Sequence, residues 1–381
     1  MKIWIPVLCA VAVLLSGCGG ENGGSERKGK KGSSTADVVG QFSNKKIEQL
    51  AAEAYVLLEK EKYSRAKIKM AQAYGMFQRR GVKDEAMHMS FLKGFCKVSD
   101  ALQENDKAIK YANEVLKEAL SDNDRIFAYN KLGSANRRKG EHDKAIGYHQ
   151  KALEIGLEAL GPSHSDVALC YHNIGSACFG RGEFDNAIAY HERAAAIWLE
   201  TLGPDHPRIA AAYHGTGAAY AGKGVFGRAI VNYEAALAIW VKKFGSMHPD
   251  VATCYNNLGL AHDKDDEPDK AIGYYEKALA IRLKTFGSKH PDVATSYNNL
   301  GSAFSNKGDY DEAIANHGKA LLIWQKTFGP EHPSVATTYN NGAVAYSRKG
   351  EYDKAVDYYE KCLAIELKTL GSEHPDVAIT Y

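Results

Sequence analysis

A period of 42 residues runs through most of the chain. In each copy a glycine is followed three residues later by a histidine, and in all but the first copy a proline follows that histidine. A fixed period of this length without slips of register is typical of a solenoid, in which each copy is one structural unit that packs on its neighbours. The repeating glycines are Gly161, Gly203, Gly245, Gly287, Gly329 and Gly371.

The unit from His290 to Gly329 predicts two helices. Pro291 suits the first turn of a helix, where no backbone N–H is needed, and Asp292 complements the positive end of the helix dipole. Gly308 predicts the end of this helix, and a second helix is expected from Asp309 to Phe328. The apolar residues that form one face of the first helix are Val293, Tyr297, Leu300 and Phe304.

Small residues recur at one position of each predicted helix. A glycine inside a helix costs about 1 kcal/mol relative to alanine. Its recurrence therefore indicates that two helices pack closely at that point. The small residues of the first helices are Gly133, Gly175, Gly217, Gly259, Gly301 and Ala343, and those of the second helices are Ala145, Ala187, Ala229, Ala271, Ala313 and Ala355.

The motif Tyr297-x2-Leu300-Gly301-x2-Phe304, followed by Tyr310-x2-Ala313, resembles the tetratricopeptide repeat. The 42-residue length, the Gly-x2-His-Pro linker and paired asparagines resemble the longer, kinesin-light-chain type of this repeat. The resemblance implies an all-α fold, a right-handed α-solenoid of helix-turn-helix repeats. The paired asparagines are Asn256-Asn257, Asn298-Asn299 and Asn340-Asn341.

The repeats divide the chain into regions. Six 42-residue repeats are expected over residues 124–371, and two divergent repeats without the linker are expected over residues 43–123. Residues 372–381 begin a further, incomplete repeat. The divergent repeats fit an N-terminal cap of the solenoid.

The first 18 residues predict an export signal, because Lys2 precedes a short apolar run that ends in small residues. The end of this run, Leu15-Ser16-Gly17-Cys18, resembles the bacterial lipobox, which implies lipidation of Cys18 and a membrane-anchored protein of the bacterial cell envelope. A plain secretory signal is the alternative. Residues 19–42 are expected to form a flexible Gly/Ser/Lys tether.

Several functions are disfavoured. The 48 Lys and Arg residues against 46 Asp and Glu give a net charge of only +2, which argues against nucleic-acid binding. No catalytic motif or phosphate loop is present, so we expect neither an enzyme nor a cofactor. Because the linker histidines occur once per repeat, on the order of 10 Å apart, we expect them to cap helices rather than bind metal.

The resemblance implies that the first helices line the concave side of the solenoid and bind a protein or an extended peptide. Asparagine amides both donate and accept hydrogen bonds, so a ladder of them could hold a peptide backbone. The mildly basic groove favours an acidic or neutral segment. The predicted groove residues are Asn130, Arg137, Arg138, His172, His214, Asn256, Asn298, Asn306, Asn340 and Arg348.

Three alternatives stay open. The asparagines could bond only to neighbouring helices, which would leave the ladder without a ligand. The array could instead associate end to end as a structural subunit of an envelope complex. It could also be the targeting arm of an enzyme that continues beyond residue 381.

Overall fold

The computed structural model describes residues 35–60, 62–79 and 84–371, together with 374, 377 and 380. Cys18 and the predicted signal lie outside the described residues. The backbone is helical from Thr35, so residues 35–42, assigned to the flexible tether from their composition, belong to a helix. Most of the predicted incomplete repeat also lies outside the described part, although Val377 is buried there.

The described residues form sixteen α-helices and no strand, as the sequence predicts. The helices of the divergent region are α2 (Thr35–Glu59), α3 (Tyr63–Arg79), α4 (Glu85–Ala101) and α5 (Asn105–Lys117). The helices of the 42-residue repeats are α6 (Asp122–Arg138), α7 (His142–Leu160), α8 (Ser165–Gly180), α9 (Phe184–Leu202), α10 (Pro207–Gly222), α11 (Phe226–Phe244), α12 (Pro249–Lys264), α13 (Pro268–Phe286), α14 (Pro291–Lys307), α15 (Tyr310–Phe328), α16 (Pro333–Lys349) and α17 (Tyr352–Leu370).

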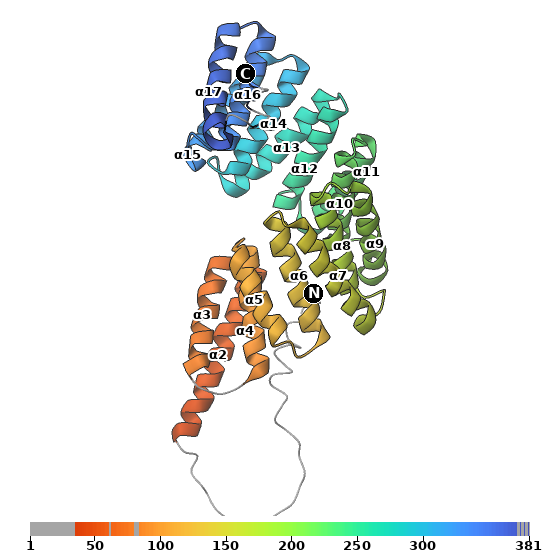
Figure 1. The fold of residues 1–381 in the computed structure, drawn as a ribbon, viewed down its shortest axis with the longest axis vertical. Helices are drawn as coiled ribbons and strands as arrows, with labels where there is room; N and C mark the ends of the chain where they lie inside the picture. Colours follow the sequence, from red (N-terminus) through yellow and green to blue (C-terminus); the bar gives the residue numbers. More distant parts are fainter. Residues whose placement is uncertain are drawn as a thin grey trace, which may run out of the picture.

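Each helix packs on the helices before and after it in the chain, and the pairs stack in order along a curved path (Figure 1). The substantial contacts between helices two apart are all made by even-numbered helices, from α2 with α4 to α14 with α16. The even-numbered helices are therefore closer together than the odd-numbered ones. They form the inner, concave side of the solenoid, as expected for the first helix of each repeat.

The linker histidines begin the first helices as N-cap residues. In His290, Nδ1 accepts a hydrogen bond of 3.2 Å from the backbone N–H of Asp292, and the ring stacks on Phe286 at 4.5 Å between centroids. This confirms the capping interpretation. The same cap is made by His164, His206, His248 and His332.

The recurring small residue of the first helix lies against a ring of the second helix. A methyl group added at Gly301 would lie 2.7 Å from Cε1 of His317, and one added at Gly259 would lie 2.7 Å from the ring of Tyr275. Close packing therefore explains these glycines, as predicted. In the last repeat Ala343 occupies the predicted position, and Gly342 instead faces a tyrosine ring.

Among the helices of the described residues, none combines the length and the apolar character that crossing a membrane requires.

A pair of alanine substitutions tests this packing. Gly301→Ala forces the buried ring of His317 to move and should lower the free energy of unfolding by about 1 to 3 kcal/mol. Gly318→Ala is the matched control, because a methyl group there meets nothing within 4 Å. Its better helix propensity should raise stability by up to about 1 kcal/mol. Urea unfolding followed by circular dichroism measures both changes, and equal effects would contradict the packing argument.

Candidate functional site

The candidate site is the concave groove on the even-numbered helices. Residues spaced three and four apart on each of these helices share its inner face. On α12 this face carries Thr253, Asn256 and Leu260, with the side chains of Thr253 and Leu260 exposed. The groove thus presents a continuous row of first-helix side chains.

The predicted asparagines do form a ladder, but its rungs lie within the protein. The Oδ1 atom of Asn298 accepts a hydrogen bond of 3.3 Å from Nδ2 of Asn341, on the next first helix, and lies 3.1 Å from Nδ1 of His317. The same arrangement holds Asn130, whose Oδ1 accepts from Asn173 at 3.1 Å. In each bond, the accepting asparagine occupies the first position of the residue pair in one repeat. The donating asparagine occupies the second position of the pair in the next repeat. The side-chain oxygens are therefore already engaged in joining repeats.

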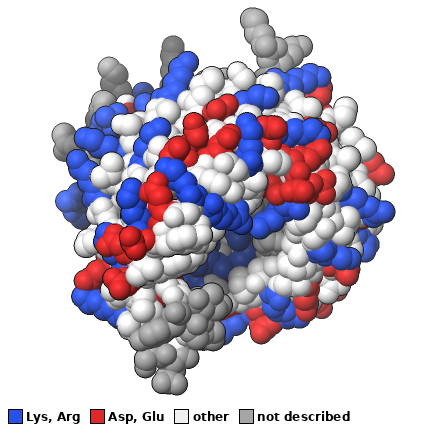
Figure 2. All heavy atoms as spheres, turned by 90° about the horizontal axis from the view of Figure 1, so that it is seen from above, with Lys and Arg blue, Asp and Glu red and all other residues white. Residues whose placement is uncertain are grey.

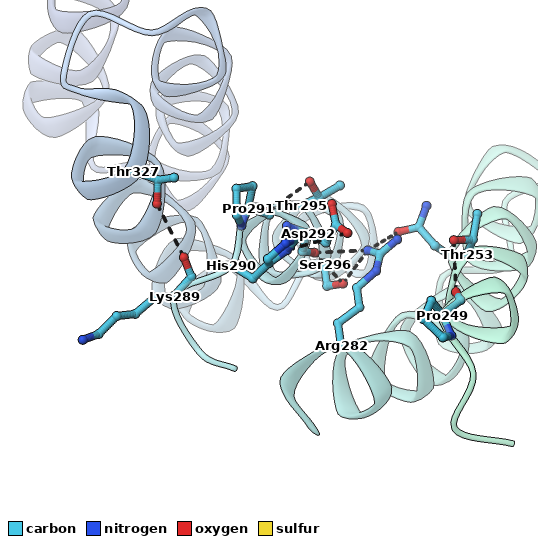
Figure 3. Close-up of polar contacts among 11 residues, drawn as sticks. Pro249, Thr253, Arg282, Lys289, His290, Pro291, Asp292, Thr295, Ser296 and Thr327 are labelled. Carbon is cyan, nitrogen blue, oxygen red and sulfur yellow. Dashed lines mark hydrogen bonds and ion pairs between the residues drawn. The ribbon is translucent and has the colours of Figure 1, made fainter. Parts of the chain in front are cut away.

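Arg282 reinforces one rung of the ladder (Figure 3). It reaches from α13 between α12 and α14, and its Nη1 donates to Oγ of Ser296 at 2.7 Å and to Oδ1 of Asn256 at 3.3 Å. Asn256 also accepts from Asn299 at 3.0 Å. Burial lowers the pKa of Arg282, while nearby Asp292 opposes this shift. The guanidinium thus fixes the amide of Asn256 from inside the repeat.

The ladder changes at the junction of α8 and α10. Gly215 stands where four of the other 42-residue repeats place the donor asparagine, and the ring of His191 fills the space that a side chain there would occupy. Nδ1 of His191 lies 3.1 Å from Nδ1 of His172. His214 resumes the pattern, with Nε2 at 2.8 Å from Nδ2 of Asn257. His214 is therefore a half-buried member of the inter-repeat network, whereas half-buried His172 pairs within its own repeat.

His149 and His191 are buried in uncharged form. His149 and His191 are each 1% exposed. Burial lowers the pKa of His149 to about 3, with Arg137 adding to the effect, and burial lowers the pKa of His191 to about 3. Neutral rings can pack against helix backbone without an unpaired charge. Within the described residues no group of three or more His, Cys, Asp or Glu side chains is placed to hold a metal ion.

The other predicted groove residues differ in how fully their polar groups are engaged. Arg138 forms an ion pair with Asp100 and donates to Asn105. Arg137 is exposed and makes no ion pair within the described residues. Asn340, half-buried on the last complete first helix, makes no side-chain hydrogen bond within the part that the structure describes. The two remaining residues bond across repeats: Asn306 donates to Asp263 and Arg348 donates to the carbonyl of Ser305.

Sequence reasoning missed a group of lysines on α4 and α6, which gather around Phe127. One signal could have found them. Cys96 and Ala108 have the same spacing as Gly133 and Ala145, so they set the register of the divergent repeat. In that register Lys97 falls on the inner face.

An array of paired helices that presents one helix of each pair to a shared concave face defines a class of repeat scaffold. The sequence model of the tetratricopeptide repeat matches residues 124–189, 171–230, 217–284, 265–306 and 292–368. These matches cover more than half of the chain, which therefore belongs to the tetratricopeptide-repeat family. Members of this family are generally non-catalytic protein-interaction scaffolds.

Two solved structures show the same fold, and a third is similar to part of this chain. RapI in its apo form has 15% sequence identity and a TM-score of 0.62, covering 84% of this chain and 86% of that one. A Rap protein complexed with Competence and Sporulation Factor has 13% identity and a TM-score of 0.55, covering 89% of this chain and 100% of that one. A kinesin-light-chain-like protein of Podosopora anserina, with nearly identical TPR-like repeats, has 28% identity and a TM-score of 0.49, covering 55% of this chain and 99% of that one. None of the curated proteins matches this chain.

Two equivalent asparagines test the role of the ladder. Asn298→Ala leaves Asn341 and the buried His317 without an acceptor and should lower the free energy of unfolding by about 1 to 3 kcal/mol. Asn340→Ala removes a side chain with no such bond in the described part, so the change should stay within about 0.5 kcal/mol. Urea unfolding of the two variants measures the difference. Equal stabilities would mean that the ladder does not couple the repeats.

Proposed function

We propose that this protein is a non-catalytic scaffold that holds an extended segment of a partner protein in its concave groove. The observation that carries the proposal is the inner face of the even-numbered helices, which leaves apolar and basic side chains exposed. Leu260 is 44% exposed and Phe179 is 40% exposed. Arg137 adds an exposed guanidinium without an ion pair within the described residues. Apolar and basic groups on one narrow surface favour an extended segment of acidic or neutral character.

The inter-repeat bonds change which side chains are expected to bind. The oxygens of Asn256 and Asn298 already accept hydrogen bonds, so these residues chiefly set the spacing of the helices. We therefore expect a partner to contact Asn340, Arg137 and the exposed side chains that lie between the hydrogen-bonded asparagines. A Rap protein of the same fold was solved with a bound factor, which is consistent with binding to a solenoid of this kind.

A charge placed in the groove tests this function. Leu260→Glu on α12 should reduce capture of the partner from the native envelope by about tenfold or more, because it puts a charge into the apolar part of the contact. Leu322→Glu on α15 is the matched control, because Leu322 is 70% exposed on a second helix. Mass spectrometry quantifies the captured protein.

Equal capture by the two variants would place the binding surface outside the groove. Light scattering on the purified protein provides the second measurement, since a mass that grows with concentration would favour end-to-end association instead.

We further propose that the protein is anchored in a bacterial envelope by a lipid on Cys18, on the basis of Leu15-Ser16-Gly17-Cys18 at the end of the apolar run. Cys18→Ser should abolish lipidation and release the protein from the membrane fraction. Mass spectrometry of the mature N-terminus checks this. A mature N-terminus elsewhere, without lipid, would support a plain secretory signal.

A further inference from the structure

The ring of His191 lies in a slot between two first helices. His191 belongs to α9, and the slot is left open by Gly175 on α8 and Gly215 on α10. A methyl group added at Gly175 would lie 3.0 Å from Cε1 of the ring, and one added at Gly215 would lie 2.6 Å from its Nε2. The ring therefore packs on both first helices and sets the distance between them.

The polar neighbour of His191 is a second imidazole. Nδ1 of His191 lies 3.1 Å from Nδ1 of His172 on α8, and the two ring centroids are 4.8 Å apart. One of these nitrogens carries a proton and donates a hydrogen bond, and the other accepts it. If both rings were charged, two N–H groups would point at each other and the bond would be lost. The contact is therefore compatible with at most one charged ring.

The equivalent buried histidines face an amide instead. Nδ1 of His149 lies 3.0 Å from Oδ1 of Asn130, and Nδ1 of His317 lies 3.1 Å from Oδ1 of Asn298. A carboxamide oxygen accepts hydrogen bonds, so it can still accept one from a protonated ring. Among the three buried histidines at this position of the described repeats, His191 alone faces another imidazole.

The charges around this pair of rings do not balance an added proton. Burial lowers the pKa of His172, and Arg137 on α6 and Arg208 on α10 lower it further. The pKa of His191 is lowered to about 3, first by burial and then by His172 and His214. Within the described residues, no carboxylate is among the groups that shift these two pKa values. The hollow at the middle of the face shown in Figure 2 has the same sign, since lysine and arginine side chains gather there while both signs of charge are mixed around its rim.

His214 on α10 extends the cluster to the next repeat. Its Nε2 lies 2.8 Å from Nδ2 of Asn257, and burial lowers its pKa. Two further titratable groups interact with the cluster, Tyr233 on α11 and His149 on α7. Both are uncharged near neutral pH, because burial raises the pKa of Tyr233 and lowers that of His149. The groups that surround the rings are thus neutral or positive.

Other bonds across this junction lie near the helix ends. Because Gly215 has no side chain, it cannot donate the ladder hydrogen bond between α8 and α10. Nη1 of Arg208 donates to Oγ of Ser165 at 2.9 Å at the start of the two helices, and Lys223 forms an ion pair with Asp185 where α10 ends. The middle of the junction therefore depends on the packing of the buried ring.

We infer that the junction of α8, α9 and α10 is an acid-sensitive joint of the solenoid. The joint is closed while His172 and His191 are neutral. Protonation of His191 drives its ring out of the slot and into water, and α8 and α10 separate. Because both helices lie on the concave side, opening of the joint changes the curvature of the groove. The inference goes beyond the proposed function and holds whether or not a partner is bound.

The direction of the pH effect follows from the pKa of His191 in the two states. A histidine released into water has a pKa of about 6.5. In the slot the pKa is about 3. Below the value in water the open joint binds more protons than the closed one, so opening becomes more favourable as the pH falls. For one ring, the opening equilibrium should rise about 25-fold between pH 7 and pH 5.

Hydrogen exchange of the full chain, followed by mass spectrometry at pH 7 and pH 5, tests the joint. After correction for intrinsic exchange rates, the protection of residues 165–222 should fall about 20-fold or more at pH 5. Residues 249–286 serve as the internal reference and should change far less. In that segment Tyr275, which does not gain a proton in this range, fills the equivalent slot on Gly259.

Replacement of His191 by a ring that does not titrate should abolish the response. His191→Tyr is the matched variant, because Tyr233 and Tyr275 occupy the same place in their own repeats. His191→Phe provides a second such ring without a hydroxyl group. His332→Asn is the control, since it removes a histidine that caps α16 and leaves a residue that caps helices well. This control should keep the wild-type response.

Four results would overturn the joint. The wild-type protein could keep the protection of residues 165–222 at pH 5, or it could lose protection equally in residues 249–286, which would indicate general acid unfolding. A folded His191→Tyr or His191→Phe variant could retain the selective loss, which would place its cause at another residue. Loss of the response in His332→Asn would show that the effect does not depend on the ring in the slot.

Discussion

The 42-residue repeats depend on one close contact inside each helix pair, in which a ring of the second helix lies on a glycine of the first. His317 on Gly301 and Tyr275 on Gly259 show the geometry, and neither site has room for a methyl group. Each such contact sets the distance between the two helices of a repeat. Because the contact recurs at a fixed period, the 42-residue repeats have similar shapes, and similar units stack into a regular curve.

A second set of contacts joins one repeat to the next. This set is weaker at the third 42-residue repeat, which is formed by α10 and α11. Gly215 interrupts the asparagine ladder on one side of that repeat. On the other side, Gly227 and Asp265 stand where the neighbouring repeats form ion pairs such as Lys307 with Asp269. The stability of a solenoid is nearly a sum over units and their interfaces. On each of its two sides, the third repeat therefore keeps either the ladder hydrogen bond or the ion pair, but not both.

Much of this architecture could be predicted from the sequence because its causes are local. The cap at His290 involves a residue two positions away, and Gly308 ends its helix by adopting a left-handed conformation. The engagement of Asn298 could not be predicted in the same way. Its partner Asn341 lies 43 residues away, and only the stacking of repeats brings them together. Lys97 was missed for a different reason, since the divergent repeats lack the linker that marks the register.

These two kinds of contact divide the groove into parts with different roles. Toward the C-terminal end, the side-chain oxygens of residues such as Asn256 and Asn298 are committed to the fold, so this part offers a surface of fixed shape. Toward the N-terminal end, Lys97 and Arg137 are exposed without ion pairs within the described residues. A bound segment would gain shape complementarity from the first part and charge complementarity from the second. Because charge acts over a longer range than packing, the N-terminal end would determine how a segment enters, and the amide-lined end would determine whether it fits.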